Sequence, residues 1–163
     1  MNIMFKTLTS ILVLGFLLSL TACGQEAEAP DENESNQQGV EEMNGWQLEV
    51  QAVQESEQLR VDMLLTNKTD EVQTLIYPSS QTYELVLTDE SDEEVYRFSE
   101  GMMFTMALIE EEIETGGTQK FQESISVADL EEGHYTLSAE IVGKPQNEVE
   151  LPTTTIDVDI TKS

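Results

Sequence analysis

Residues 133–141 read Gly-His-Tyr-Thr-Leu-Ser-Ala-Glu-Ile, and this stretch decides the fold class. Tyr135, Leu137, Ala139 and Ile141 alternate in it with polar side chains. Successive side chains of a β-strand point to opposite faces of the sheet, so an alternation of period two is typical of a strand with one buried face. The stretch therefore predicts a half-buried strand whose apolar side chains, Tyr135 among them, lie in a core.

The same alternation recurs on both sides of this strand. It returns near the C-terminus at residues 156–160, and earlier in the chain residues 46–50 and 59–63 predict a hairpin that turns at residues 55–57. We expect the ring of Phe98 in the core as well. Seven or eight short strands with turns at this spacing predict an all-β fold, an antiparallel β-sandwich. The remaining strands are expected at residues 72–77, 83–87, 95–98 and 119–125.

The first 22 residues have the pattern of a secretory signal peptide. Lys6 is their only charged residue, and an apolar run follows at residues 8–20. The run is shorter than the roughly 20 apolar residues that span a bilayer. It ends in Leu-Thr-Ala-Cys at Cys23, which resembles the lipobox of bacterial lipoproteins. The resemblance implies removal of residues 1–22 and diacylation of Cys23 with fatty acids such as palmitate.

Lipidation of Cys23 predicts an extracytoplasmic protein that is lipid-anchored to the bacterial cell membrane. Two acyl chains give a stable anchor, whereas one chain gives only marginal binding. Residues 24–44 are rich in Glu, Gln, Asn, Ala and Ser and contain almost no large apolar residue. Such a segment cannot bury enough surface to offset its ordering entropy. We therefore predict that residues 23–44 form the lipidated Cys and a disordered acidic tether, and residues 45–163 the folded domain.

The net charge of the chain limits the classes of molecule that it can bind. The formal net charge is −26, and the 7 basic residues are scattered singly along the chain. Nucleic acid is excluded as a partner, because phosphate binding needs clustered basic residues. Cys23 is the only cysteine, so no disulfide forms within the chain. The domain must be held by its hydrophobic core alone, which about 120 residues can supply.

The residue inventory also argues against an enzyme. A Ser or Cys nucleophile usually needs a nearby base, and His134, the only histidine, is interpreted as a surface residue at a strand start. We therefore name no catalytic residue, no cofactor and no metal site built from His and Cys. The acidic run at residues 89–94 could gather Ca²⁺ but lacks the glycine and spacing of an EF-hand loop, so we interpret it as a solvated turn. The tripeptide Asn67-Lys68-Thr69 fits a glycosylation acceptor, and we interpret it as a turn.

The most unusual segment lies at residues 99–108, because it gathers Met102, Met103, Phe104 and Met106 within five positions. Methionine-rich surfaces serve as adaptable binding sites. Two interpretations stand side by side. The segment either crosses between the sheets and fills the core, which we take as the default, or presents these side chains to a partner.

Several motifs between residues 61 and 141 occur together in this chain. They are the run Tyr-Pro-Ser-Ser-Gln-Thr-Tyr-Glu-Leu at residues 77–85 and Val-Tyr-Arg-Phe-Ser at residues 95–99, with Phe104-Thr105 and Ala107, Asn67 with Thr69, and Gly133 with Tyr135. Together they resemble the BsuPI family, named for an intracellular proteinase inhibitor of bacilli that acts on subtilisin-type serine proteases.

The resemblance implies an immunoglobulin-like antiparallel sandwich and proteinase-inhibitor activity. The chain departs from the family pattern at Ser80, Glu84 and Ile125, where Gly, Asp and an aromatic residue are common. Those departures are compatible with the same fold, but they weaken the inference that this chain shares the inhibitory activity of the family. The lipobox places the expected target, a serine protease, outside the cytoplasm. The candidate protease-contact residues are Met102, Met103, Phe104 and Met106. The alternative function is a non-inhibitory envelope protein or ligand-binding module of the same fold.

Overall fold

The computed structural model describes residues 37–162, and within them all regular structure is β-strand. Over these residues, no helix has the length and apolar character needed to cross a membrane. The strands are β1 (Gln37–Met43), β2 (Trp46–Glu55), β3 (Gln58–Asn67), β4 (Gln73–Tyr77), β5 (Tyr83–Asp89), β6 (Glu94–Arg97), β7 (Ile109–Ile113), β8 (Thr118–Ser126), β9 (Gly133–Ile141), β10 (Lys144–Pro145) and β11 (Thr153–Ile160).

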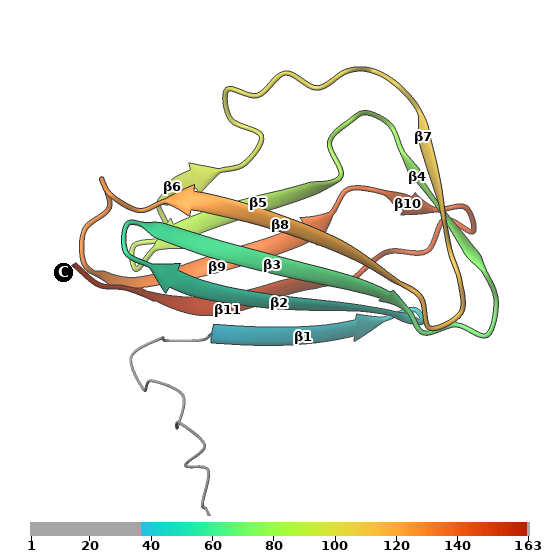
Figure 1. Cartoon of the computed structure of the whole chain (residues 1–163), viewed down its shortest axis with the longest axis horizontal. Helices are drawn as coiled ribbons and strands as arrows, with labels where there is room; N and C mark the ends of the chain where they lie inside the picture. The colour runs from blue at the N-terminus through green and yellow to red at the C-terminus, as the bar shows by residue number, and fades with distance from the viewer. Residues whose placement is uncertain (1–36, 163) are drawn as a thin grey trace, which may run out of the picture. The chain divides into compact units, whose positions relative to one another are not determined.

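The strands form three antiparallel sheets. Two of them have four strands, in the orders β1-β2-β3-β8 and β11-β9-β5-β6. Figure 1 shows these two sheets lying one over the other, while a three-stranded sheet of order β10-β4-β7 forms one end of the domain. The predicted all-β antiparallel sandwich is therefore confirmed. The described residues hold eleven strands rather than seven or eight, because β1, β7 and β10 were not predicted.

The period-two strands supply the core. On β9 the side chains of Tyr135, Leu137, Ala139 and Ile141 are buried, as the alternation predicts, and they join one cluster with the inward side chains of β2, β3, β5 and β11. Every buried apolar residue lies between residues 46 and 160. Residues 37–162 thus contain a complete hydrophobic core and form one folding unit. Phe98 is only half-buried and packs against the edge of this core.

Strand β1 corrects the predicted extent of the tether. The tether was expected to reach Asn44, which is wrong for Gln37–Met43, since these residues pair along their whole length with β2. The strand is held mainly by backbone hydrogen bonds to an existing sheet edge, and most of its side chains are exposed. A burial argument from composition could not detect it. Cys23, the signal peptide and the rest of the tether lie outside the described residues.

Asn67 closes the turn after β3 with its side chain fully buried. Its amide donates hydrogen bonds to the carbonyl oxygens of Glu71 (2.8 Å) and Ile113 (2.9 Å). Its side-chain oxygen accepts from the backbone amide (2.9 Å) and hydroxyl (2.7 Å) of Thr69. These contacts confirm the interpretation of residues 67–69 as a turn, because an amide engaged in this way inside the fold has no room for a glycan.

Candidate functional site

The segment between β6 and β7, residues 99–108, stands out from the body of the sandwich, and we call it the methionine loop. Figure 1 shows it arching over the connection between β4 and β5. The exposed fraction is 98% for Met103, 90% for Met106, 67% for Leu108 and 53% for Met102. The default expectation that these methionines fill the core is therefore wrong. The core is already closed by the inward side chains of the strands.

Phe104 anchors the middle of the methionine loop. Its side chain is half-buried, and its ring centroid lies 6.0 Å from that of Phe98. The ring of Phe98 lies 4.4 Å from that of Tyr83, which in turn lies 5.8 Å from that of Phe121 on β8. Aromatic pairs at such distances stabilise a structure beyond their area burial. Phe104 thus attaches the loop to the aromatic edge of the sandwich while its methionine neighbours remain in solvent.

Thr105 provides a second attachment through a reciprocal pair of hydrogen bonds. The backbone amide of Thr105 donates to the hydroxyl of Ser80 at 3.0 Å. The backbone amide of Ser80 donates to the carbonyl oxygen of Thr105, also at 3.0 Å. These two hydrogen bonds attach the methionine loop, at Thr105, to the β4–β5 connection, at Ser80. Met103 and Met106 flank this attachment.

Glu84 fixes the start of the methionine loop. This carboxylate is only 8% exposed and accepts hydrogen bonds from the backbone amide of Ser99 (3.0 Å) and the side-chain amide of Gln81 (3.1 Å). The guanidinium of Arg97 lies 4.0 Å away. A buried carboxylate that accepts several such bonds holds the surrounding backbone in place. Gly101 then turns the chain outward with φ of 73°, a value that glycine adopts without strain.

Of these attachments, the sequence identified only Phe104 as part of a site, and it did so as a candidate contact rather than as an anchor. The resemblance did single out the run that contains Ser80, Gln81 and Glu84, but only as a family marker. What the sequence could not show is that the run reaches the methionine loop. Glu84 and Ser99 are 15 positions apart and Ser80 and Thr105 are 25 positions apart, and the antiparallel topology brings each pair together.

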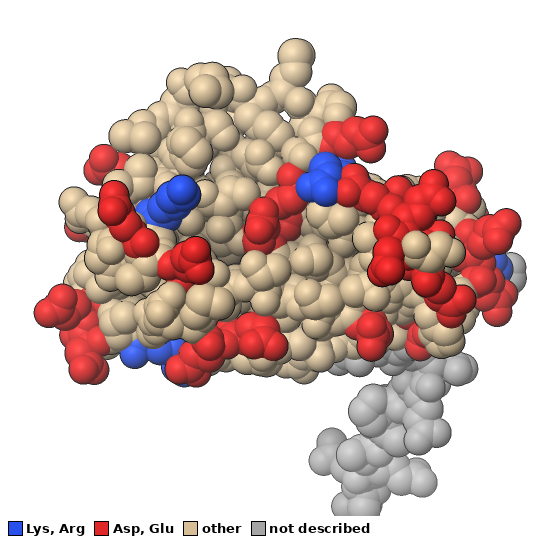
Figure 2. Space-filling model, turned by 180° about the vertical axis from the view of Figure 1, so that it is seen from behind, with Lys and Arg blue, Asp and Glu red and all other residues tan. Residues whose placement is uncertain are grey.

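The methionine loop differs from the rest of the surface in charge. No charged residue occurs from Gly101 to Ile109, whereas 25% of the whole chain is charged. Figure 2 shows the corresponding upper part of the molecule without blue or red atoms, while acidic side chains crowd much of the remaining face. An uncharged, apolar projection on an otherwise acidic protein is a surface that could pack into an apolar recess.

The aromatic cluster beneath the loop contains tyrosines that remain protonated. Burial raises the pKa of Tyr83, and its hydroxyl donates a hydrogen bond of 2.8 Å to Glu123. Burial, together with the charges of Glu123 and Glu84, raises the pKa of Tyr96 to about 12. Both hydroxyls therefore stay neutral at any physiological pH.

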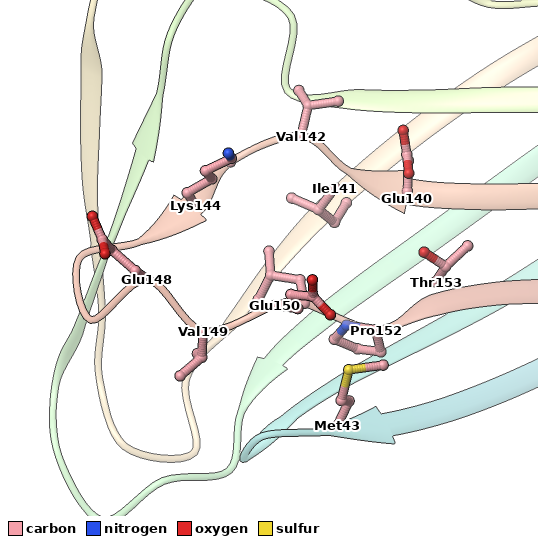
Figure 3. A pocket seen from close by; sticks show the side chains of 12 residues that line it. Met43, Glu140, Ile141, Val142, Lys144, Glu148, Val149, Glu150, Pro152 and Thr153 are labelled. Atoms are coloured by element: carbon pink, nitrogen blue, oxygen red, sulfur yellow. The ribbon is translucent and has the colours of Figure 1, made fainter.

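A second feature is a hollow of about 590 Å³ at the end of the domain near β10. Figure 3 shows Glu140, Glu150 and Lys144 at separate points of its wall, with Met43 on the opposite side. Its lining mixes apolar side chains with Glu140, Glu148, Glu150 and Lys144, and it contains neither a cysteine nor a histidine. The hollow has the shape of a shallow binding surface rather than of a catalytic pocket.

The other charged candidates stay apart from the methionine loop. His134 is exposed at the start of β9 and pairs with Asp159 on β11, as expected for a surface residue. In the acidic run, the carboxylate of Asp89 accepts hydrogen bonds from the amides of Ser91 (2.8 Å) and Glu93 (2.9 Å), an arrangement that closes a turn. Over residues 37–162 there is no group of at least three His, Cys, Asp or Glu placed to hold a metal ion.

The comparisons with known proteins agree with the geometry. The model of a family described as BsuPI, intracellular proteinase inhibitor, matches residues 46–146, which is more than half of the chain. The matched region begins at β2, contains the methionine loop and its attachments at residues 80, 84 and 104, and ends after β10. A comparison with curated proteins found no match.

Proposed function

The chain belongs to the BsuPI family, and from this premise we propose that it is a membrane-anchored inhibitor of subtilisin-type serine proteases that acts through the methionine loop. The observation that carries the proposal is the combination of near-complete exposure at Met103 and Met106 with firm attachment at the intervening residues, Phe104 and Thr105. An inhibitor loop must present its side chains and yet keep its shape.

The attachments support tight binding because they lower its entropic cost. A free loop loses backbone and side-chain freedom when it enters a cleft, and a loop held in its bound shape has less freedom to lose. Phe104 is already packed and Thr105 is already bonded to Ser80. The methionine side chains then contribute apolar contacts, and their unbranched thioethers adapt to the shape of a recess.

The inhibition that we propose needs no chemical step by the inhibitor. Protein inhibitors of this kind place an extended segment in the active-site cleft, where its backbone pairs with a strand edge of the protease. Residues 102–108 have no regular secondary structure, so most of their backbone groups are not engaged in a sheet and could pair with such an edge. Met103 or Met106 would fill an apolar specificity pocket, and the chain itself supplies no catalytic group.

Location is part of the proposal. The lipobox-like sequence at Cys23 supports a lipid-anchored protein outside the cytoplasm, whose targets would be secreted or wall-associated proteases. The family description names an intracellular inhibitor, so this chain would be an exported variant of that family. The acidic surface would also repel anionic envelope polymers and keep the domain in solution.

The second candidate function is a non-inhibitory envelope protein or ligand-binding module of the same fold. It is favoured by the hollow near β10, whose volume of about 590 Å³ could hold part of a ligand. Under this alternative, changes near Lys144 or Glu150 would affect function, and changes in the methionine loop would not.

The test is a titration of subtilisin-type proteases with a protein that spans residues 37–163, so that β1 is included. An inhibitor gives a stoichiometric end point and is recovered uncut. Met103→Asp should weaken inhibition about hundredfold or more, because a carboxylate is costly to bury in an apolar pocket. The matched control is Val72→Asp, since Val72 is an exposed apolar residue outside the loop.

Both variants should unfold at the same urea concentration as the parent protein, because neither side chain belongs to the core. The proposal fails if the parent protein inhibits no protease of a broad panel. The part of the proposal that places the protease contact in the methionine loop fails if Met103→Asp and Met106→Asp inhibit as strongly as Val72→Asp.

A further inference from the structure

We infer that Met103 and Met106 are sites of oxidative modification by peroxides, and that their conversion to sulfoxides weakens binding by the methionine loop. The second half of this inference rests on the proposed function, whereas the first half does not. It begins from the contrast among the methionines that the structure describes. Met103 and Met106 are 98% and 90% exposed, while Met63 on β3 is 2% exposed.

The chemistry requires only access of the oxidant to the thioether. A peroxide transfers one oxygen atom to the sulfur, so that its O–O bond breaks and a sulfur–oxygen bond forms. The sulfur is oxidised, and hydrogen peroxide is reduced to water. No proton or group leaves the protein. Because Met103 and Met106 project into solvent on an uncharged surface, nothing in their surroundings shields the sulfur from a neutral oxidant.

The same exposure means that oxidation leaves the fold intact. Oxidation of a buried methionine introduces a polar oxygen into a core and disrupts it, which would apply to Met63. The sulfurs of Met103 and Met106 lie outside the core cluster, and the loop is held by Phe104, Thr105 and Glu84 instead. The modification therefore changes the character of the projecting side chains without changing the loop that carries them.

The consequence for binding follows from the change in polarity. A thioether is apolar and flexible, whereas a sulfoxide is a strong hydrogen-bond acceptor that must lose water when it enters an apolar pocket. Burying such a group without a partner is unfavourable. We expect oxidised protein to inhibit its target about tenfold to hundredfold less well than the reduced protein. Methionine sulfoxide reductase should restore inhibition, because the sulfoxide is the reversible product.

The experiment treats the protein of residues 37–163 with hydrogen peroxide under native conditions and locates added oxygen by peptide mass spectrometry. Met103 and Met106 should each gain one oxygen, and Met63 should gain none while the fold persists. Met43 on β1 is 42% exposed and lies outside the loop, so it serves as an internal comparison for partial exposure. The inference is overturned if Met103 and Met106 oxidise no faster than Met63.

Inhibition is then measured before and after peroxide for three proteins. The parent and Met43→Leu should lose inhibition by the same factor. The triple variant with leucine at Met102, Met103 and Met106 should show a ratio of one between treated and untreated samples, whatever its starting inhibition, because Met102 is also 53% exposed in the loop. Equal inhibition by the reduced and oxidised parent would overturn the second half of the inference. If the reduced parent inhibits nothing, the proposed function and that second half fall together, while the peptide masses still decide the modification itself.

Discussion

Replacing Glu84 by leucine should release the start of the methionine loop and destabilise the domain. Leucine removes both carboxylate oxygens and leaves the amide of Ser99 and the side-chain amide of Gln81 without their acceptor. The site is 8% exposed, so water can replace these bonds only if the loop moves outward. The loss of Glu84 affects Arg97 less, because the Arg97 side chain is half-exposed and keeps its ion pair with Glu94.

The size of the effect follows from the contacts. Hydrogen bonds to a charged acceptor contribute about 1.5–3 kcal/mol each, and Glu84 accepts two of them from buried or half-buried donors. The leucine side chain regains part of that loss through apolar burial, at about 25 cal/mol per Å². We therefore expect Glu84→Leu to lower the free energy of unfolding by about 2–4 kcal/mol. Glu84→Gln keeps an acceptor oxygen for Ser99 and should cost about 1 kcal/mol.

Urea unfolding provides the measurement, and Trp46 provides the probe, because it is the only tryptophan and lies fully buried on β2. The control is Glu110→Leu on β7, where an exposed carboxylate should matter by less than about 0.5 kcal/mol. Limited proteolysis should cut Glu84→Leu within the methionine loop before other sites. The reasoning is refuted if Glu84→Leu costs less than about 1 kcal/mol, or if Glu84→Gln costs as much as Glu84→Leu.

Two further predictions concern pH and the membrane anchor. The pKa values of all four tyrosines (Tyr77, Tyr83, Tyr96 and Tyr135) are raised, chiefly by burial. Their stabilising contribution is therefore complete below the unfolded pKa of about 10 and is lost as pH rises toward 12 and beyond; tyrosinate absorbance with a midpoint near pH 10 in folded protein would contradict this. Cys23→Ala should abolish fatty-acid labelling and release the protein from membranes. If the Cys23→Ala variant is still labelled and stays in the membrane after a high-salt wash, the lipobox interpretation is wrong.

The period-two strands could be predicted because burial and geometry act together in them. On β9 and β11 every second side chain enters the core, so the sequence itself alternates. The β2–β3 hairpin was found for the same reason, and its turn lies where it was predicted, with Ser56 at a positive φ of 58°. Where an element buries one face, its sequence carries the pattern of its structure.

Strand β1 shows where that logic stops. It pairs at the edge of a sheet and leaves most side chains in solvent, so alternation is not required of it. A different pattern marked it, namely Asn44-Gly45, whose φ values of 53° and 80° form the tight turn between β1 and β2. Asn-Gly is a strong hairpin dipeptide, because both positions tolerate positive φ. Attention to turn chemistry rather than to burial would have placed this strand.

The residues of the methionine loop fall into two groups, those that attach the loop to the sandwich and those whose side chains project into solvent. Some of the residues in the motifs that carry the family resemblance attach the loop to the sandwich, namely Ser80, Glu84, Phe104 and Thr105. Met103 projects beyond them and carries no fold-holding contact. Because the attachments do not depend on it, its side chain can change without loss of the domain. Under the proposed function, the attachments would keep the loop in shape, and the choice of target would depend on the side chains that the loop presents.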